Sequence, residues 1–435
     1  MTAKARLAVR DRTIRVVDRV SRDLADRLLE LGMADPVVNA LPPIDSSQVT
    51  VVVPTHERPE RLDRLLGSIE PGLRIIVVDD CSVNVDAIAN VAASHNADLV
   101  ALPTNVGPAA SRNAGLRRVT TPFVSFVDDD VVLDRDCIRT LLRHFNDPKV
   151  GMVAPRVGGL RNGARETWIQ RYENARSSLD LGPNPSTVRP YAPVAWVPAA
   201  CVLARVEAIG DGFSGDLRKG EDVDLVWRLV DQGWRVRYEP SALAFHENRA
   251  TLRKWIARKA FYGTSADLLA QRHPRKMATA VLSPWSAGVA VALLAQRRWS
   301  VPAASLLSVV AAVQISKKVT QSNHPARVAF ALTADGVTVA LWQVAALLLR
   351  HWWPATAVAC SFSNRTRRAV LVLGVVDAAV EYWRTSPRLD PLRFGIARRL
   401  DDMAYGFGLW SGAIKGRSLR ALLPQIRLGN HAGRD

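Results

Sequence analysis

Apolar and polar residues alternate in two ways along the first 270 positions. Short runs rich in β-branched residues, typical of buried strands, are separated by segments with apolar residues every three or four positions, typical of amphipathic helices. The expected strands are residues 49–53, 74–78, 98–102, 123–127 and 234–239, and the expected helices are 57–69, 108–118 and 134–145. Strand–helix repetition with short loops predicts an α/β fold with a mostly parallel sheet and helices on both faces. In such a sheet, the chemistry lies at the carboxyl ends of the strands.

The rest of the chain has a different pattern. Residues 277–295 and 299–315 carry no charge, residues 328–349 carry only Asp335, and residues 369–380 carry only Asp377. Seven of the twelve tryptophans follow residue 280, mostly near the ends of these runs, where interfacial aromatics occur in membrane proteins. A buried helical domain is the alternative, since only the first and third runs approach the roughly 20 residues that a spanning helix needs. Basic residues fill every gap between the runs, which favours helices lying in the membrane plane over a simple spanning topology.

The net charge of +17 is unevenly distributed. Residues 1–246 carry 31 Lys and Arg against 32 Asp and Glu, whereas residues 247–435 carry 27 against 9. This basic excess lies between uncharged apolar runs, a pattern that favours an anionic membrane surface over nucleic acid. The four cysteines form no CxxC pair, so neither a disulfide scaffold nor a zinc knuckle is indicated. The first 20 residues lack a secretory apolar core, and we therefore expect the chain at the cytoplasmic face of the membrane, associated or multi-pass.

Three regions are expected from these patterns. Residues 1–47 form a short helical segment that ends in a linker at Pro42-Pro43. Residues 48–270 form the α/β domain, and residues 271–435 form a largely helical, basic and apolar region associated with the membrane.

Three strand-end and helix-start signals are weak when taken singly. Pro54-Thr55 ends the first strand in a turn that can place backbone groups against a flat heterocycle, and Asp80 ends the second strand, where a carboxylate can accept from the imide of a uracil. Acidic residues after strands are equally common as helix caps. A glycine turn at Gly107 opens the next helix, and Arg112 follows at a spacing that could direct it to a phosphate; a helix start with a surface arginine is the alternative.

A stronger signal is the acidic triplet Asp128-Asp129-Asp130, which ends a wholly apolar strand. Three adjacent negative charges repel one another unless a cation lies among them. By strand alternation Asp128 and Asp130 point the same way and Asp129 points away. Oxygen ligands without His or Cys nearby suit Mg²⁺ or Mn²⁺ held jointly with a diphosphate. A solvated acidic loop is the alternative.

The last signal is Gly220-Glu221-Asp222-Val-Asp224 at the start of an amphipathic helix. Acidic residues in a first turn are favoured by the helix dipole, which gives a purely structural explanation. A carboxylate such as Asp222 could instead act as general base toward an acceptor hydroxyl. After the next strand comes His246, which could complete the coordination of the cation, although a lone histidine is usually structural.

These segments, in this order, resemble the family-2 nucleotide-sugar glycosyltransferases of the GT-A fold over about residues 48–265. The resemblance implies an inverting transfer in a single displacement. It also implies that Asp80 faces the uracil, that Arg112 belongs to the donor site, that Asp128 and Asp130 form the DxD pair with Asp130 as metal ligand, and that Asp222 is the catalytic base.

A wider resemblance covers nearly the whole chain. Residues 25–36, 220–240 with His246, 258–267, 389–394 and 401–406 look like the glycosyltransferase of the mycofactocin system. That family implies glucose transfer from UDP-glucose to a peptide-derived redox cofactor, extended as a β-1,4-linked oligosaccharide. Two alternatives stay open: a membrane-bound transferase of the same fold acting on a lipid-linked or cell-wall polymer acceptor, and a non-catalytic membrane scaffold that binds a nucleotide sugar.

Overall fold

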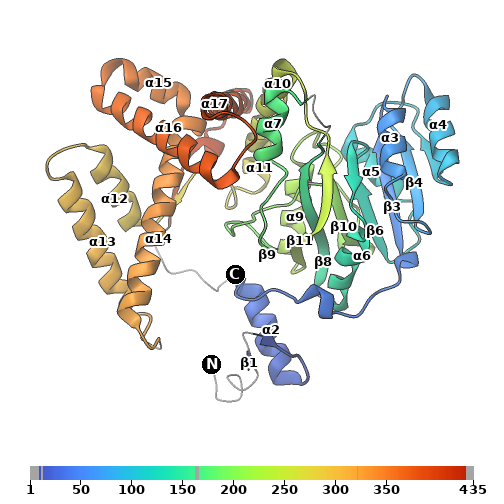
Figure 1. The fold of residues 1–435 in the computed structure, drawn as a ribbon, viewed down its shortest axis with the longest axis horizontal. Coiled ribbons are helices and arrows are strands. Elements are labelled where there is room, and N and C mark those ends of the chain that lie inside the picture. The colour runs from blue at the N-terminus through green and yellow to red at the C-terminus, as the bar shows by residue number, and fades with distance from the viewer. Residues whose placement is uncertain (1–8, 11–12, 162–165, 321, 428–435) are drawn as a thin grey trace. The chain divides into compact units, whose positions relative to one another are not determined.

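The computed structural model describes residues 9–10, 13–161, 166–320 and 322–427. The chain divides into two compact units: residues 1–164 with 176–248 form unit 1, and residues 165–175 with 249–435 form unit 2 (Figure 1). The three regions expected from the sequence stay predictions, and each unit is described by itself.

The first half of the sheet in unit 1 is parallel, as expected. Strands β3 (Val49–Thr55), β4 (Arg74–Asp79), β5 (Asp98–Ala101) and β6 (Phe123–Val127) lie in the order β5-β4-β3-β6. Every residue of β3 from Val49 to Val53 is buried, which explains why the strand is a continuous apolar run rather than an alternating one.

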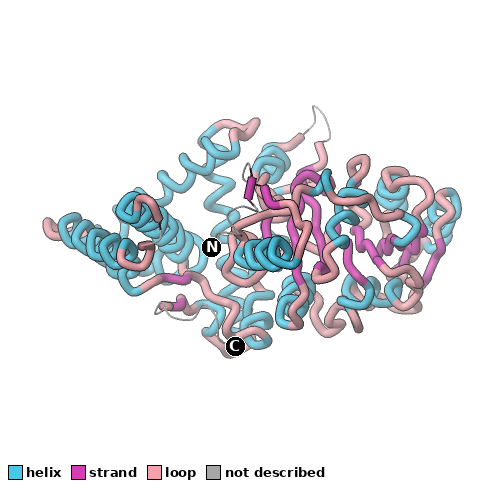
Figure 2. The backbone as a smooth tube through the Cα atoms, turned by 90° about the horizontal axis from the view of Figure 1, so that it is seen from below, coloured by secondary structure: helices cyan, strands magenta, loops and turns pink. Residues whose placement is uncertain are grey.

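Helices cover both faces of this parallel half (Figure 2). Val49, Val51 and Val53 belong to the core that includes the leucines of α3 (Pro59–Leu66). The same core takes in residues of α4 (Val85–Ser94) and α6 (Cys137–Leu142), and a 3₁₀ turn, Arg143–Asn146, extends α6. On the other face, Gly115 of α5 (Pro108–Leu116) lies so close to Val52 that an added Cβ would stand 2.3 Å from a valine methyl. The prediction of two covered faces is confirmed.

The second half of the sheet is mixed. Strand β10 (Cys201–Arg205) pairs antiparallel with β6 and with β8 (Val150–Gly159), and β8 pairs parallel with β11 (Arg235–His246). Strands β7 (Val131–Leu133) and β9 (Ser186–Val188) both pair antiparallel with β11. Unit 1 also contains α8 (Val206–Ile209) and α9 (Glu221–Asp231). The sheet is therefore parallel over residues 49–127 and mixed beyond them.

The N-terminal segment of unit 1 is tied to the sheet by ion pairs. Helix α2 (Arg19–Leu31) is capped by Asp18, and short strands Val9–Arg10 (β1) and Thr13–Ile14 (β2) precede it. Asp26 Oδ2 lies 2.9 Å from Lys149 Nζ, and Asp35 Oδ1 lies 2.7 Å from Nη2 of the fully buried Arg237 in β11. Short 3₁₀ turns, Val38–Ala40 and Ser46–Gln48, then lead into β3.

Unit 2 is mainly helical. Its helices are α7 (Trp168–Ala175), α10 (Leu252–Gly263), α11 (Ser265–Arg272), α12 (Pro284–Leu294), α13 (Ser300–Ser316), α14 (Pro325–Ala346), α15 (Trp353–Phe362), α16 (Asn364–Thr385) and α17 (Pro391–Lys415). A π turn at Leu347–His351 follows α14, and a 3₁₀ turn at Arg420–Leu422 follows α17. The short strand Val281–Leu282 (β12) pairs with Gln425–Ile426 (β13). The four apolar runs expected to be helical lie mainly in α12, α13, α14 and α16.

A buried ionic network joins the helices of unit 2. Arg398 donates to both carboxylate oxygens of Asp377, at 2.8 and 2.9 Å. Arg350 Nη1 lies 3.1 Å from Asp402 and 3.5 Å from Asp401, and Lys259 Nζ lies 3.6 Å from Asp401. These pairs account for acidic residues inside an otherwise apolar region, because a buried charge requires a partner.

One helical segment among the described residues, Pro325–His351, is long and apolar enough to cross a membrane by length and composition alone. Helices α12 and α13 are apolar but shorter. A single helix of this kind also occurs as the core helix of soluble proteins.

Candidate active site

The acidic triplet lies at the carboxyl end of β6, and basic side chains from the start of α3 and from β11 surround it. Arg58 Nη1 lies 3.3 Å from Asp129 Oδ1 and 3.7 Å from Asp130 Oδ2. Arg61 Nη1 lies 3.8 Å from Asp130 Oδ2, and His246 Nε2 lies 3.4 Å from Asp130 Oδ1. Basic side chains of the protein therefore supply part of the positive charge that was expected from a metal ion alone.

The expectation that Asp129 points away from Asp130 is wrong. A single guanidinium nitrogen of Arg58 approaches both carboxylates, and Asp129 also accepts a hydrogen bond of 2.9 Å from Thr55 Oγ1. The physical reason is that β6 ends at Val127, so the alternation of a strand does not continue through the triplet.

The two buried carboxyls of this cluster differ in their protonation equilibria. Burial, together with the neighbouring charge of Asp130, raises the pKa of Asp129 to about 6. Burial would also raise the pKa of Asp130, but His246, Arg58 and Arg61 hold it well below its usual range. Burial would lower the pKa of His246, yet the Asp130 carboxylate raises it above the ordinary value. Asp130 is therefore ionised at neutral pH.

Arg112 connects the triplet to the start of α9. Its side chain is buried, with Nη2 2.5 Å from Asp128 Oδ1 and Nη1 3.1 Å from Glu221 Oε1. Burial would lower the pKa of Arg112, but these two carboxylates raise it. Arg112 thus lies beside the acidic triplet, and its guanidinium is bonded to two carboxylates of the protein, so its expected role in the donor site stays a prediction. A guanidinium donates in a planar fork, which fixes the direction of both acceptors.

The three acids in the first turn of α9 have different partners. Glu221 binds Arg112, whereas Asp224 accepts from Ser214 Oγ at 2.6 Å and from Arg228 Nε at 3.0 Å. Asp222 accepts only from backbone, with Val223 N at 2.8 Å, and no described side chain donates to it. Burial and the charge of Glu221 raise the pKa of Asp222 to about 7. Asp222 therefore has the properties of a proton acceptor at neutral pH.

The predicted donor residues occupy two positions. Thr55 belongs to the triplet cluster through its bond to Asp129, and Pro54 precedes it in β3, paired with Val78 of β4. The Asp80 carboxylate accepts from Val106 N at 2.7 Å and from Gly107 N at 2.9 Å. Asp80 thereby fixes the glycine turn that opens α5. A carboxylate has further lone pairs, so this binding leaves it able to accept another hydrogen bond.

The predicted metal ligands are only partly assembled. Asp130 and His246 face each other, and an oxygen with an imidazole nitrogen suits a Mn²⁺-type cation. Asp128 is instead held by Arg112. Among the residues that the structure describes, no group of three His, Cys, Asp or Glu side chains has an arrangement that could hold a metal. Asp130 and His246 fit a divalent cation that takes its other ligands from a bound molecule.

Sequence reasoning missed the arginines of α3. Arg58 is the N-cap residue of α3, and Arg61 and Arg64 follow at intervals of three residues, a spacing that places Arg61 and Arg64 on one side of the helix. Arg61 Nη2 and Arg64 Nη2 lie 3.0 and 2.5 Å from the two oxygens of Glu247. This spacing could have been recognised in the sequence. The carboxylates that pair with these arginines, however, follow about 70 and 185 residues later in the chain.

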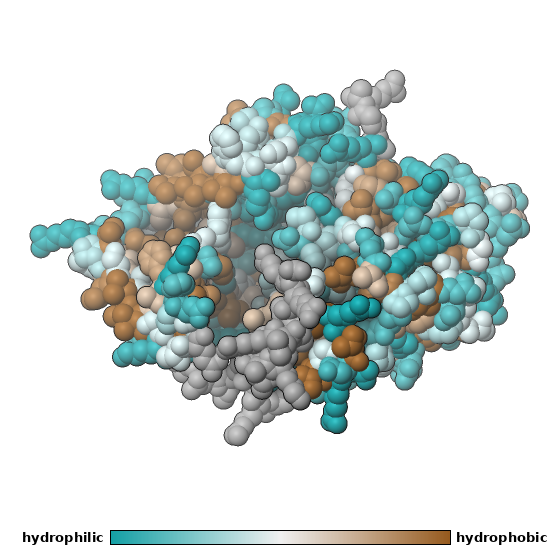
Figure 3. Space-filling view, turned by 60° about the horizontal axis from the view of Figure 1, so that its bottom comes forward, coloured by the Kyte–Doolittle hydropathy of each residue, from teal (hydrophilic) through white to brown (hydrophobic). Residues whose placement is uncertain are grey.

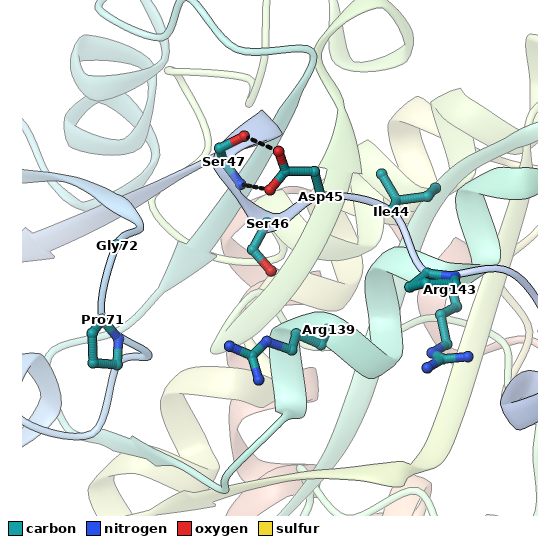
Figure 4. Close-up of a pocket in the computed structure, with 9 residues that line it drawn as sticks. Ile44, Asp45, Ser46, Ser47, Pro71, Gly72, Arg139 and Arg143 are labelled. Carbon is teal, nitrogen blue, oxygen red and sulfur yellow. Dashed lines mark hydrogen bonds between the residues drawn. The ribbon is translucent and has the colours of Figure 1, made fainter.

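A pocket of about 460 Å³ lies elsewhere in unit 1 (Figure 4). It is lined by Ile44, Asp45, Ser46, Ser47, Pro71, Gly72, Arg139 and Arg143, together with Pro43. These residues precede β3 and β4 or belong to α6 and the 3₁₀ turn after it, so the pocket lies at the amino ends of these strands. The acidic triplet lies at the carboxyl end of β6, which is the opposite end of the parallel strands. We therefore exclude this pocket from the candidate active site.

Comparisons with known proteins identify glycosyltransferases. Residues 50–194 match the family Glycosyl transferase family 2, and residues 123–368 match Glycosyl transferase family group 2. A pre-mycofactocin glycosyltransferase of Mycobacterium tuberculosis is 42% identical over 96% of this chain and 90% of its own length. An N-acetylglucosaminyltransferase of a Rhizobium species is 30% identical over 45% of this chain and 47% of its own.

Among solved structures, a mannosyltransferase from Pyrobaculum calidifontis in complex with GDP-Man and Mn²⁺ aligns with a TM-score of 0.41. The alignment has 18% identity and covers 74% of this chain and 94% of that one. This likeness is too slight to carry an argument about the present site. The identity over nearly the full length of the mycobacterial relative is decisive: the chain belongs to glycosyl transferase family 2, among the pre-mycofactocin glycosyltransferases.

Proposed function

We propose that this glycosyltransferase moves glucose from UDP-glucose to premycofactocin, with inversion and with a divalent metal, and extends the sugar as a β-1,4-linked oligosaccharide. The name of the mycobacterial relative, which is 42% identical over 96% of this chain, supports the acceptor class. The observation that carries the proposed chemistry is Asp222, a half-buried carboxylate whose pKa is raised to about 7 and which has no side-chain donor among the described residues.

Asp222 acts as general base in this proposal. As the acceptor hydroxyl oxygen bonds to the anomeric carbon, its proton passes to a carboxylate oxygen of Asp222, and the bond from the anomeric carbon to UDP breaks. A base is most effective when its pKa lies near the working pH. The Asp222 side chain is next to Glu221, and Arg112 joins Glu221 to Asp128, so the base is fixed relative to the acidic triplet.

Asp130 and His246 would hold the divalent cation, either Mg²⁺ or Mn²⁺, and Asp128 would contribute to the same site. A bound divalent cation offsets the negative charge that develops on a diphosphate leaving group. Thr55 and Pro54 at the end of β3, and Asp80 at the end of β4, would contact the nucleoside. Arg112 then acts by orienting Asp128 and Glu221, since both of its terminal nitrogens are engaged.

The test is a transfer assay on the purified chain. UDP-glucose is supplied with Mn²⁺ or Mg²⁺, with and without premycofactocin, and both UDP release and product mass are recorded. We expect an acceptor-dependent mass gain of one hexose per step, lost on addition of a chelator and lost in Asp222→Asn. UDP release without this product would contradict the proposed acceptor. If no UDP-sugar released UDP, the proposed donor would be contradicted.

A second candidate acceptor is a lipid-linked or cell-wall polysaccharide. The observation that favours it is the exposure of large apolar side chains on α13 and α16, where a polyprenyl chain could lie. Recovery of the glycosylated product in an organic extract would support this acceptor, whereas a water-soluble glycosylated small molecule would exclude it.

A further inference from the structure

Two turns of unit 2 that are distant in the sequence lie side by side. Gln296, between α12 and α13, donates from Nε2 to the backbone oxygen of Arg365 at the start of α16, at 2.6 Å. The first turn contains Arg297 and Arg298, and the second is followed by Arg367 and Arg368. We call the five arginines Arg297, Arg298, Arg365, Arg367 and Arg368 the basic corner.

The basic corner carries uncompensated positive charge. All five arginines are exposed, and none is within ion-pair distance of a carboxylate in the described part of the chain. Three of them lie in the first turns of α16, where the helix dipole disfavours positive charge. Like charges gathered in this way repel one another, and an external anion would relieve the repulsion.

Large apolar side chains project from the same turns. Trp299 follows the first arginine pair and is 51% exposed, and Phe362, the last residue of α15, is 86% exposed. An aromatic residue next to arginines is typical of the boundary between lipid headgroups and acyl chains. Neither residue contributes to the hydrophobic clusters formed by the buried residues of unit 2.

Exposed aliphatic residues continue from this corner along two helices. They recur at helical spacing and are each between 45% and 68% exposed: Leu306, Val309, Val310 and Val313 in α13, and Leu371, Val372, Val375 and Val376 in α16. Figure 3 shows hydrophobic side chains gathered over the helical part of the molecule with hydrophilic ones between them. A group of neighbouring, exposed apolar side chains of this kind marks an interaction surface.

We propose that the basic corner, with Trp299, Phe362 and the adjoining faces of α13 and α16, docks on an anionic lipid surface. The arginines bind phosphate groups of the lipids, and the aromatic and aliphatic side chains enter the boundary between headgroups and acyl chains. A second copy of the chain is a poorer occupant, because a two-fold interface would bring like-charged corners together. Nucleic acid would bind the arginines but not the valine and leucine faces.

The test measures vesicle binding by the full chain without donor or acceptor, so its result is independent of the proposed transfer reaction. Vesicles of phosphatidylcholine alone are compared with vesicles that also contain phosphatidylglycerol, by co-sedimentation at low and at physiological salt. We expect binding to the anionic vesicles only, weakened by salt. Equal binding to both kinds of vesicle, or none to either, would overturn the proposal.

Substitutions in the basic corner test whether this surface is the one that binds the vesicles. Arg297→Gln with Arg298→Gln should weaken binding to anionic vesicles about tenfold or more, since each basic residue near such a surface contributes to binding. The matched control is Arg117→Gln with Arg118→Gln, an exposed arginine pair in unit 1, which should bind as wild type. Trp299→Ser with Phe362→Ser should also weaken binding. An equal loss in the control pair, or an aromatic variant that changes only the oligomeric state, would contradict the proposed surface.

Discussion

The Arg112 guanidinium donates to the Asp128 carboxylate at 2.5 Å, and Arg112 is only 3% exposed. The same guanidinium reaches Glu221, which is 109 residues away in the sequence. One buried cation therefore joins the two acidic motifs that sequence reasoning treated as separate signals. Removing one partner of a buried ion pair leaves the other charge uncompensated, at a cost of about 3–5 kcal/mol.

Arg112→Gln should lower both stability and activity. We expect a lower midpoint of thermal unfolding and a lower kcat, because Asp128 and Glu221 lose their common donor and repel each other. Arg112→Lys keeps the positive charge but loses the planar pair of N–H donors that binds two carboxylates at once. Compared with Arg112→Gln, it should recover part of the stability, while kcat stays low. Calorimetry and steady-state kinetics measure the two effects. A wild-type kcat in the lysine variant would contradict the positioning role.

The ionisation of Asp222 should control the pH dependence of transfer. Its pKa of about 7 means that the base is protonated, and inactive, below that pH. We therefore expect kcat/KM to rise with pH through about 7 and to level off above it. In Glu221→Gln a repelling charge is lost, so the pKa of Asp222 should fall and the rise should move to lower pH. A rise that moves to higher pH in that variant, or does not move, would contradict the assignment.

Arg58 should compete with a divalent cation. Its guanidinium lies 3.3 Å from Asp129 and 3.7 Å from Asp130, and Asp130 is a proposed ligand of the cation. Arg58→Gln should therefore strengthen the binding of Mn²⁺ to the donor-free protein several-fold, and Asp130→Ala should abolish it; electron paramagnetic resonance measures free Mn²⁺ directly. Arg64→Gln is the control, because Arg64 pairs with Glu247. Weaker Mn²⁺ binding in Arg58→Gln would show that the arginine supports the site instead.

Two glycines in unit 2 should respond in opposite directions to alanine. A Cβ at Gly408 in α17 would stand 1.9 Å from the backbone oxygen of Ala260 in α10, so Gly408→Ala should destabilise unit 2 by about 1–3 kcal/mol or more. Gly374 in α16 has no atom within 4 Å of such a Cβ, and Gly374→Ala should stabilise that helix by about 0.5–1 kcal/mol. The midpoint of thermal unfolding tests both, and destabilisation by both would contradict the helix packing described here.

The regular elements near the start of the α/β region could be predicted from sequence with small errors. The strand expected at residues 123–127 is β6, and the helix expected at residues 108–118 is α5, two residues shorter at its end. Strands β7 to β10 were missed, because two of them are only three residues long and the other two lie in a stretch without clear alternation with helices. The catalytic, donor and metal roles of the site residues stay predictions.

The sequence by itself determined which side chains could do chemistry. An apolar strand followed by three aspartates, and an acidic helix start 92 residues later at Asp222, are local patterns that need no partner to be recognised. Only the tertiary structure decided how they are used. It placed Arg58 and Arg61 against the triplet and turned Arg112 to Asp128 and Glu221, and it left Asp222 without a side-chain donor among the described residues. The physical reason is that charge partnership depends on distance in space, and the partners here are up to 109 residues apart in the chain.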